Sequence, residues 1–470
     1  MRSRRGPAVP LPLLEITAMP GASLSRWTLT YFACALLCLV AAEGLMAMGF
    51  GYPGAAIEAP ETLILVHLVA IGWLSLLLCG ALFQFVPVLV ARPLLGEALP
   101  PVALVFIILG LTALLSGFAG MGGLVDIPAS AMPLGGLLLI IGFGLVIVSL
   151  GRTLWAARPL AMPARFVVVG LAALAATALF GESFALILSG LVGGEAALSL
   201  LLNGVPLHAL LGLGGWMSFT AMGVSYRLLA MFMLAPETER FSTSVVLATG
   251  TLTLALLAAA TPFAMAAGAG VAGMLLAAAV TGLCALGVYG SDMLALYRQR
   301  KRRNIELNAI AATGAFGALL AACLLLVFLL LSGSLPAHVG ALTYLFAFGW
   351  LGGLGLAKLY KIVAFLTWLE CFAPVLGKRQ TPRVQDLVDE RHAAPWFGVY
   401  YLAVGLGTLT LLVDLPLAFR LFAFSQLVAT LAIIRHLYRS RELLNVPPDL
   451  RRGFVRPHPF WPQPVARKLP

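Results

Sequence analysis

Charged residues are scarce in this chain of 470 residues. They make up 10% of the sequence, and 61% of the residues are hydrophobic, whereas a soluble globular protein usually carries about 25% charged residues. This shortage excludes a protein that is surrounded by water on all sides. Apolar runs of about 18 residues or more recur along the whole chain, and each is long enough to cross the hydrocarbon core of a bilayer.

The apolar runs also lack the two-residue alternation of a membrane barrel strand, and are continuous and rich in Leu, Ala and Gly. Backbone groups inside a bilayer must satisfy one another, so such spans must be helices. The predicted fold class is an all-α polytopic membrane protein with about 12 transmembrane helices. The expected spans are 27–50, 62–89, 99–120, 132–150, 164–189, 205–233, 242–263, 268–290, 307–332, 339–368, 396–414 and 418–437.

Motifs for several common chemistries are missing. None of the six cysteines forms a CxxC pair, so neither a disulfide framework nor a zinc site is expected. Cys34 and Cys38 share a helix face and form a candidate copper pair, with two small packing residues as the simpler interpretation. No nucleotide-binding signature, HExxH motif or nucleophile–base arrangement is evident, and the sequence assigns no enzymatic activity.

Lysine and arginine are missing from every second predicted connection. The connections 51–61, 121–131, 190–204, 264–267, 333–338 and 415–417 contain none of them, and the other connections and both ends hold most of the 30. By the positive-inside rule, we expect both termini in the cytoplasm and a bacterial-type inner membrane around the spans. Membrane topology then explains the net charge of +11. The expected partner is the lipid bilayer, and binding to nucleic acid is not expected.

The expected organisation is one membrane domain over residues 27–437. A cytoplasmic segment, 1–26, precedes it, and a basic, Pro-rich cytoplasmic tail, 438–470, follows it. The one sizeable inner loop, 370–395, carries charges of both signs. We expect this loop and the tail to be solvated surface near anionic lipid.

The dipeptide Gly-Trp recurs in the spans expected second, sixth and tenth. Trp73, Trp216 and Trp350 share a register, because the same spacing separates each from an aromatic residue and a polar or basic one: Phe83-Gln84, Tyr226-Arg227 and Tyr360-Lys361. This pattern predicts three parallel four-helix units, over about 27–150, 164–290 and 307–437, arranged as three pseudo-symmetric arcs. The basic members are expected to reach the inner headgroups, and the alternative is that the repeated polar residues line a central cavity. Parallel repeats also occur in transporters, so the symmetry leaves the function open.

Histidines mark the expected outer side of the same three spans. His67 lies early in span 2, His208 early in span 6, and His338 at the start of span 10. An ionisable group inside a membrane is a functional candidate, and neutral imidazole is a common ligand of metals and haem. The structural alternative is a His that bonds only to a neighbouring carbonyl. We therefore predict His67 and His208 as candidate haem or metal ligands.

Twelve helices in three arcs, with outer-side histidines on helices 2, 6 and 10, resemble subunit I of the haem-copper oxidase superfamily. The segments His67-Leu-Val-Ala-Ile-Gly-Trp-Leu and Gly204-Val-Pro-Leu-His-Ala-Leu-Leu-Gly resemble its orphan, non-oxidase branch and the haem- and copper-containing membrane proteins of the nitric-oxide response. The resemblance implies haem as the first candidate cofactor and copper as the second. It also implies a role in respiration, the nitric-oxide response or the handling of metal or haem, with a redox or respiratory-complex partner.

The resemblance departs from the oxidases at their metal centre. In the oxidases, histidines of helices 2 and 10 share a haem, whereas span 10 here has Tyr344 at that register and span 7 has no His for copper. A full oxygen-reducing centre is therefore not expected. Three ligand sets stay open: His67 alone, His67 with Tyr344, and His67 with His208. The resemblance also implies Arg420 as a partner of haem propionates, beside its simpler interpretation as an interfacial arginine.

Three acidic residues in the expected spans are further candidates. Glu43, Glu182 and Asp414 lie in spans 1, 5 and 11, where a carboxyl group is suited to proton relay or to pairing with His. Two other functions fit the same sequence. One is a membrane transporter or permease, which the repeat and the Gly-rich helices favour but which lacks matched breaks in the middle of its spans. The other is an assembly factor without a cofactor.

Overall fold

A computed structural model describes residues 27–236, 240–260, 272–451 and 457–458. The expectations for segment 1–26, for connection 264–267 and for the tail beyond residue 451, apart from residues 457–458, lie outside this part of the chain. The part that is described contains no β-strand and has 12 helices that are long and apolar enough to cross a membrane. The predicted all-α fold class and the number of spans are therefore confirmed.

Eight of the described spans are single α-helices: α1 (Thr28–Met48), α4 (Leu99–Met121), α5 (Ala131–Ala156), α6 (Met162–Leu188), α11 (Ala272–Arg298), α12 (Leu307–Leu331), α15 (Glu390–Leu412) and α16 (Pro416–Arg441). One more consists of α9 (Phe241–Ala255) and the π-helical η4 (Leu256–Ala260). Short helices at one end are η6 (Ala373–Val375), η7 (Val384–Leu387) and α17 (Pro448–Arg451).

The remaining three spans each contain a π-helical segment in their middle, and they are called the central helices below. The first is α2 (Pro60–His67), η2 (Leu68–Ser75) and α3 (Leu76–Leu89). The second is α7 (Glu195–Leu210), η3 (Leu211–Phe219) and α8 (Thr220–Met233). The third is α13 (Leu335–Tyr344), η5 (Leu345–Gly352) and α14 (Gly353–Cys371). All three π segments contain a Gly-Trp dipeptide, so the sequence repeat is also a repeat of backbone structure.

Several predicted boundaries were wrong by more than one helical turn, and two of them are helix starts that lie six residues or more before the expected residue. The second central helix begins at Glu195 instead of 205, and a carboxylate in the first turn is favoured by the helix dipole. Helix α15 begins at Glu390 instead of 396, because the side chain of Asp389 accepts a hydrogen bond from the backbone N–H of His392 and caps the helix. Hydropathy underestimates both helices because polar residues interrupt the first turns of each.

The loop before α15 is packed, which corrects the expectation of a solvated surface. Phe372 and Leu387 are buried in a small apolar cluster that also includes Leu443 and Val446, beyond the last span. At the edge of this cluster, the guanidinium of Arg441 forms a 2.5 Å ion pair with Glu370. The loop and the start of the tail therefore form one folded layer across the helix ends.

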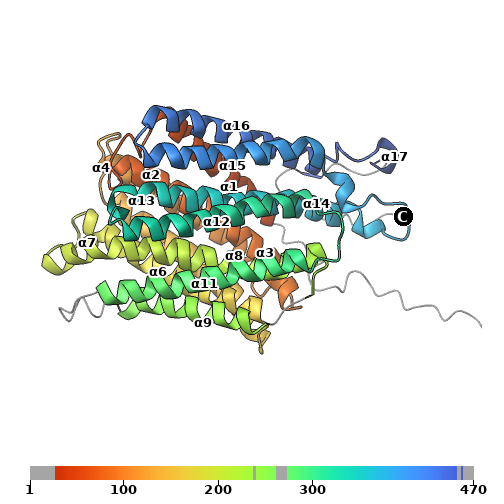
Figure 1. Ribbon diagram of the computed structural model, residues 1–470, viewed down its shortest axis with the longest axis horizontal. Helices are drawn as coiled ribbons and strands as arrows, with labels where there is room; N and C mark the ends of the chain where they lie inside the picture. The colour runs from red at the N-terminus through yellow and green to blue at the C-terminus, as the bar shows by residue number, and fades with distance from the viewer. Residues whose placement is uncertain (1–26, 237–239, 261–271, 452–456, 459–470) are drawn as a thin grey trace, which may run out of the picture.

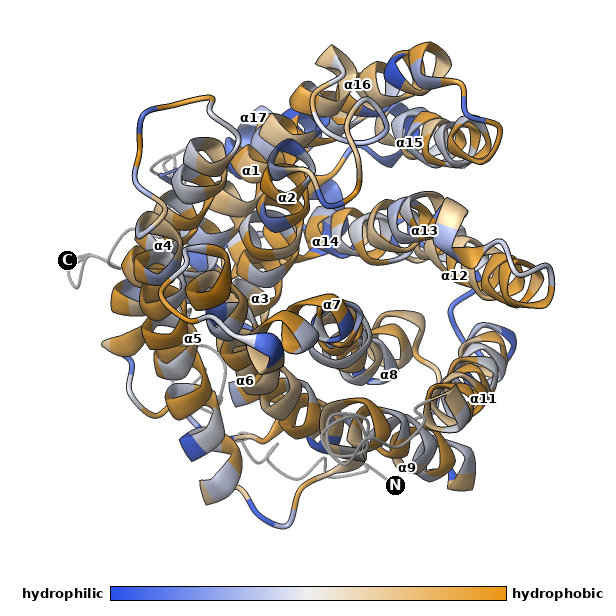
Figure 2. Ribbon diagram, turned by 90° about the vertical axis from the view of Figure 1, so that its left-hand side faces the viewer, coloured by the Kyte–Doolittle hydropathy of each residue, from blue (hydrophilic) through white to orange (hydrophobic). Residues whose placement is uncertain are grey.

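The twelve spans form three arcs that close into a ring. The arcs run from α1 to α5, from α6 to α11 and from α12 to α16, and they join where α5 packs on α6, α11 on α12 and α16 on α1. The central helices lie inside, and their segments η2, η3 and η5 contact one another pairwise. Figure 2, which looks along the helices, shows α2, α7 and α14 around the middle of the ring. The predicted arcs are confirmed.

The repeated glycine explains how each arc holds its central helix. A Cβ atom added to Gly72 would lie 2.8 Å from Cys38 on α1, one added to Gly215 would lie 2.6 Å from Ala173 on α6, and one added to Gly349 would lie 2.8 Å from Ala318 on α12. In every arc the first helix therefore approaches the central helix at this glycine, as small residues allow in membranes. Cys38 serves here as a small packing residue.

The repeated tryptophan also makes a repeated contact. The indole N–H of Trp216 donates a 3.0 Å hydrogen bond to the hydroxyl of Ser75, the second residue after Trp73. The indole of Trp73 points in turn at Gly352, the second residue after Trp350, where an added Cβ would lie 3.4 Å from its nitrogen. The indole nitrogens of Trp73 and Trp350 have no hydrogen-bond partner among the described residues.

The two ends of the ring differ in charge. At one end the connections 49–59, 122–130, 189–194, 332–334 and 413–415 contain no Lys or Arg; we call it the Lys/Arg-free end after these connections, although Arg420 of α16 lies beside them. At the other, the basic end, the connections contain the cluster Arg300, Lys301, Arg302 and Arg303 among other basic residues. Figure 1 shows the helices side by side, with α2, α7 and α13 starting at the left and α17 at the right, at the basic end.

Candidate functional site

His67 and His208 meet between the first two central helices. Their ring centroids lie 6.4 Å apart, and the ring planes differ by 31°. His67 is the last residue before η2 and His208 lies three residues before η3, so they occupy similar depths near the Lys/Arg-free end. The sequence proposed each histidine separately and left their pairing as one of three alternatives. The structure brings these two together.

Each ring is oriented by a backbone carbonyl. Nδ1 of His67 lies 2.8 Å from the carbonyl oxygen of Leu63, one turn earlier in its own helix. Nδ1 of His208 lies 3.0 Å from the carbonyl oxygen of Thr177 on α6. A carbonyl can only accept, so Nδ1 carries the proton in both neutral rings, and the lone pair is on Nε2. This is the orientation that metal-ligating histidines usually show.

Aromatic side chains and a glycine enclose the pair. The ring of Phe118 lies 5.1 Å from that of His67, and the ring of Phe184 lies 5.7 Å from that of His208. Gly181 leaves space for the second imidazole, because a Cβ there would lie 3.2 Å from Cε1 of His208. The histidines therefore sit against apolar neighbours, which favours neutral imidazole.

The spacing of the rings fits shared coordination of one ion. Imidazole nitrogens bind metals at about 2.0 Å, so two imidazoles on opposite sides of an ion have centroids roughly 6 Å apart. Among the residues that the structure describes, no group of three or more His, Cys, Asp or Glu side chains could hold a metal ion. A closed zinc site with four protein ligands is therefore not formed by them. Two histidines would be enough to hold a haem, whose iron needs fewer protein ligands.

Tyr344 lies in the corresponding register of the third central helix but belongs to a different set of contacts. Its hydroxyl donates a 2.5 Å hydrogen bond to Oε1 of Gln426 on α16, and its ring packs against Phe348 and Phe419. The same glutamine donates to Oε1 of Glu43 on α1 at 2.7 Å, and Thr430 donates to that oxygen at 3.0 Å. Tyr344 thus extends a buried network between the third and first arcs.

Arg420 supports the end of a helix. Its Nε donates a 3.3 Å hydrogen bond to the carbonyl oxygen of Ala47, in the last turn of α1, and its side chain lies over Gly49. A cation at a helix C-terminus is favoured by the helix dipole. Glu182 packs on α5, where a Cβ at Gly136 would overlap its carboxylate. These contacts give both side chains a structural role.

Lys358 is the polar residue that the sequence reasoning missed. It belongs to α14, its exposed fraction is 7%, and its Nζ has no hydrogen-bond partner among the described residues. It lines a cavity of about 60 Å³ between the three central helices. A signal was present in the sequence, because Lys358 lies eight residues after Trp350. The equivalent positions of the other two repeats, Ala81 and Val224, also line the cavity.

The neighbouring Lys361 has a different environment. Its Nζ forms a 2.7 Å ion pair with Oε2 of Glu306, which precedes α12 at the basic end. Gln385 donates a 2.7 Å hydrogen bond to the other carboxylate oxygen, which Arg302 also contacts. Burial raises the pKa of Glu306, but these donors outweigh it and leave the pKa lowered. Lys361 therefore joins loop and helix at this end instead of extending to headgroups.

The sequence matches no protein-family model and no curated protein.

Proposed function

We propose that this chain is a haem-binding integral membrane protein of haem-copper oxidase-like architecture, with His67 and His208 as its haem ligands. The observation that carries the proposal is the pair of imidazoles, 6.4 Å apart, each with Nδ1 on a backbone carbonyl. The ring of three arcs around three central helices supports it, because the resemblance rests on the same architecture.

In this proposal, neighbouring residues hold the two imidazoles in place and adjust their basicity. The carbonyl oxygens of Leu63 and Thr177 fix the orientation of the two rings and raise the basicity of Nε2. Phe118 and Phe184 restrict water around them. Haem, when bound, would supply electron transfer or the binding of a small gas such as nitric oxide or oxygen. The chain offers no third histidine for copper at this place, so a role in respiration or in the nitric-oxide response would not use an oxidase-type bimetallic centre.

The same proposal includes location. With the basic end in the cytoplasm, the positive-inside rule puts the chain in a bacterial-type inner membrane with the histidine pair toward the outer side. A redox partner would then meet the Lys/Arg-free end. Cysteine labelling of single-cysteine variants at 122–130 and 299–303, in intact cells and in lysed cells, tests this orientation.

The deciding measurement is the visible spectrum of the detergent-purified protein, expressed with haem available, as isolated and after dithionite. We expect a Soret band and a positive pyridine haemochrome assay. His67→Ala and His208→Ala should each lose or shift the band, and His338→Ala, at the start of the third central helix, should keep it.

A preparation without a Soret band would contradict the haem proposal. If metal analysis of such a preparation finds one copper per chain that both histidine variants lose, the pair is a copper site instead. If neither is found, the transporter and assembly-factor alternatives are separated by substrate uptake into proteoliposomes and by affinity purification of partners.

A further inference from the structure

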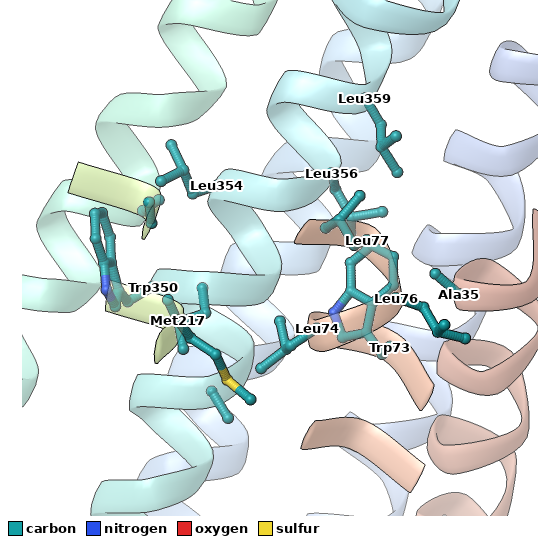
Figure 3. Packing of buried hydrophobic residues seen from close by; sticks show 14 of the residues in the cluster. Ala35, Trp73, Leu74, Leu76, Leu77, Met217, Trp350, Leu354, Leu356 and Leu359 are labelled. Atoms are coloured by element: carbon teal, nitrogen blue, oxygen red, sulfur yellow. The ribbon is translucent and has the colours of Figure 1, made fainter. Parts of the chain in front are cut away.

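The cavity between the central helices lies on the pseudo-threefold axis. Equivalent positions of the three repeats supply most of its wall, counted from the repeated tryptophan. The residues directly after the tryptophans, Leu74, Met217 and Leu351, all line it, and so do the residues eight positions after them, Ala81, Val224 and Lys358. Figure 3 shows Leu74, Leu77, Met217 and Leu354 from the three helices at this place. The axis therefore passes through the cavity.

Lys358 breaks the symmetry of this wall. Ala81 and Val224 leave the same position apolar in the first two repeats, and the other lining residues are apolar except Ser225. No carboxylate lines the cavity. An ammonium group that is buried without a partner is unfavourable in a low-dielectric interior. An anion bound from the surrounding solution would supply the missing counter-charge.

The cavity has the size and chemistry for that counter-charge. A volume of about 60 Å³ exceeds the roughly 10–15 Å³ that a single water requires. It therefore has room for a small ion of a few atoms but not for a large organic acid. The three N–H groups of Lys358 and the hydroxyl of Ser225 are donors, and charge-assisted hydrogen bonds to an anion are the strong kind.

We propose that the axial cavity is a binding site for a small monovalent anion, such as chloride or nitrite, held by Lys358 and Ser225. The site is separate from the histidine pair, which lies on the other side of the π segments. It is closer to the basic end, because Lys361, one turn further along α14, already reaches Glu306 outside the spans. Arginines at that end raise the local concentration of anions.

Thermal stability under increasing anion tests the site without depending on haem. A ligand that binds only the folded protein raises its melting temperature in a saturable way. We expect sodium chloride or sodium nitrite, exchanged against sodium gluconate at constant ionic strength, to produce a saturable rise in Tm of the purified wild-type protein. Whichever of the two ions saturates at the lower concentration is the better ligand.

Lys358→Met should weaken the apparent affinity about thirtyfold or more, as expected when one member of a buried charge pair is removed. An apolar side chain in an apolar wall should leave the fold intact. Lys361→Met is the matched control: it removes a charge from the same helix outside the cavity and should keep the saturable rise. The proposal is overturned if wild type shows no saturable rise, or if the Lys358→Met protein responds as wild type does.

Discussion

The first two repeats and the third share a backbone but differ in their polar side chains. All three central helices contain a Gly-Trp dipeptide in a π segment, and each glycine packs on the first helix of its own arc. The first two contribute His67 and His208 to one pair, whereas the third directs Tyr344 toward α16 and Lys358 toward the axis. The shared Gly-Trp segments therefore serve the packing of the fold, and the polar side chains that differ between the repeats form the candidate sites.

The hydroxyl of Ser75 illustrates the same difference at the level of one bond. It accepts from Trp216 and donates to the carbonyl oxygen of Ala70. In the third repeat the equivalent position is Gly352, and the neighbouring indole of Trp73 is left without an acceptor. Among the described residues, Trp216 is thus the repeated tryptophan whose indole N–H has a hydrogen-bond partner, while those of Trp73 and Trp350 have none.

The largest expected effect comes from the shared scaffold. Trp73→Ala, Trp216→Ala and Trp350→Ala should each destabilise the protein by about 3–5 kcal/mol, because each indole is fully buried. Unfolding in detergent measures the three effects. Trp155→Ala is the control, since its side chain is 67% exposed. Equal effects at 216 and 155 would contradict the proposed equivalence of the three tryptophans.

Moving the lysine between repeats tests whether the axis is real. In Val224→Lys combined with Lys358→Val, the charge stays in the cavity wall but comes from the second central helix. Because the two positions are equivalent around the axis, the swapped protein should recover most of the roughly thirtyfold loss of anion affinity in Lys358→Met. The saturable rise in Tm is the measurement. A folded swap variant with no response would show that the two positions are not interchangeable.

Removing one hydroxyl should make the first repeat resemble the third. Ser75→Ala leaves the indole N–H of Trp216 without its acceptor and should cost about 1–3 kcal/mol. Ser218→Ala is the matched control: that hydroxyl donates to the carbonyl oxygen of Leu213, and no tryptophan bond is lost with it. Its cost in an unfolding titration should be smaller. The interpretation fails if the two variants are indistinguishable.

The smallest effect concerns the ion pair between Lys361 of the third repeat and Glu306. The pKa of Glu306 is lowered in the folded protein, so its contribution to stability is present above the ordinary glutamate value of about 4.3. This contribution is lost as the pH falls through the lowered pKa. Wild-type Tm should therefore decrease below about pH 4 more steeply than that of Glu306→Gln. Parallel Tm curves from pH 7 to pH 3 would contradict this.

Hydropathy predicted the twelve spans because a bilayer accepts only long apolar helices, and the Gly-Trp register predicted the three arcs. The helix starts at Glu195 and Glu390 escaped this reasoning, since polar residues interrupt the first turns of both helices. His67 and His208 were recognisable as candidates because ionisable groups are rare in spans. Lys358 was not singled out, because its position eight residues after Trp350 gains its meaning only from the packing of the other two central helices around the cavity.

The sequence by itself determined the class of protein, the number of spans, the threefold repeat and the charge difference between the ends, because composition and periodicity act locally along each helix. Only the tertiary structure decided which polar residues meet. His67 and His208 are far apart in the chain, and Lys358 is buried only because two other central helices cover it. Such contacts depend on how helices turn and pack against one another, and the alternation of apolar residues along one helix does not contain that information.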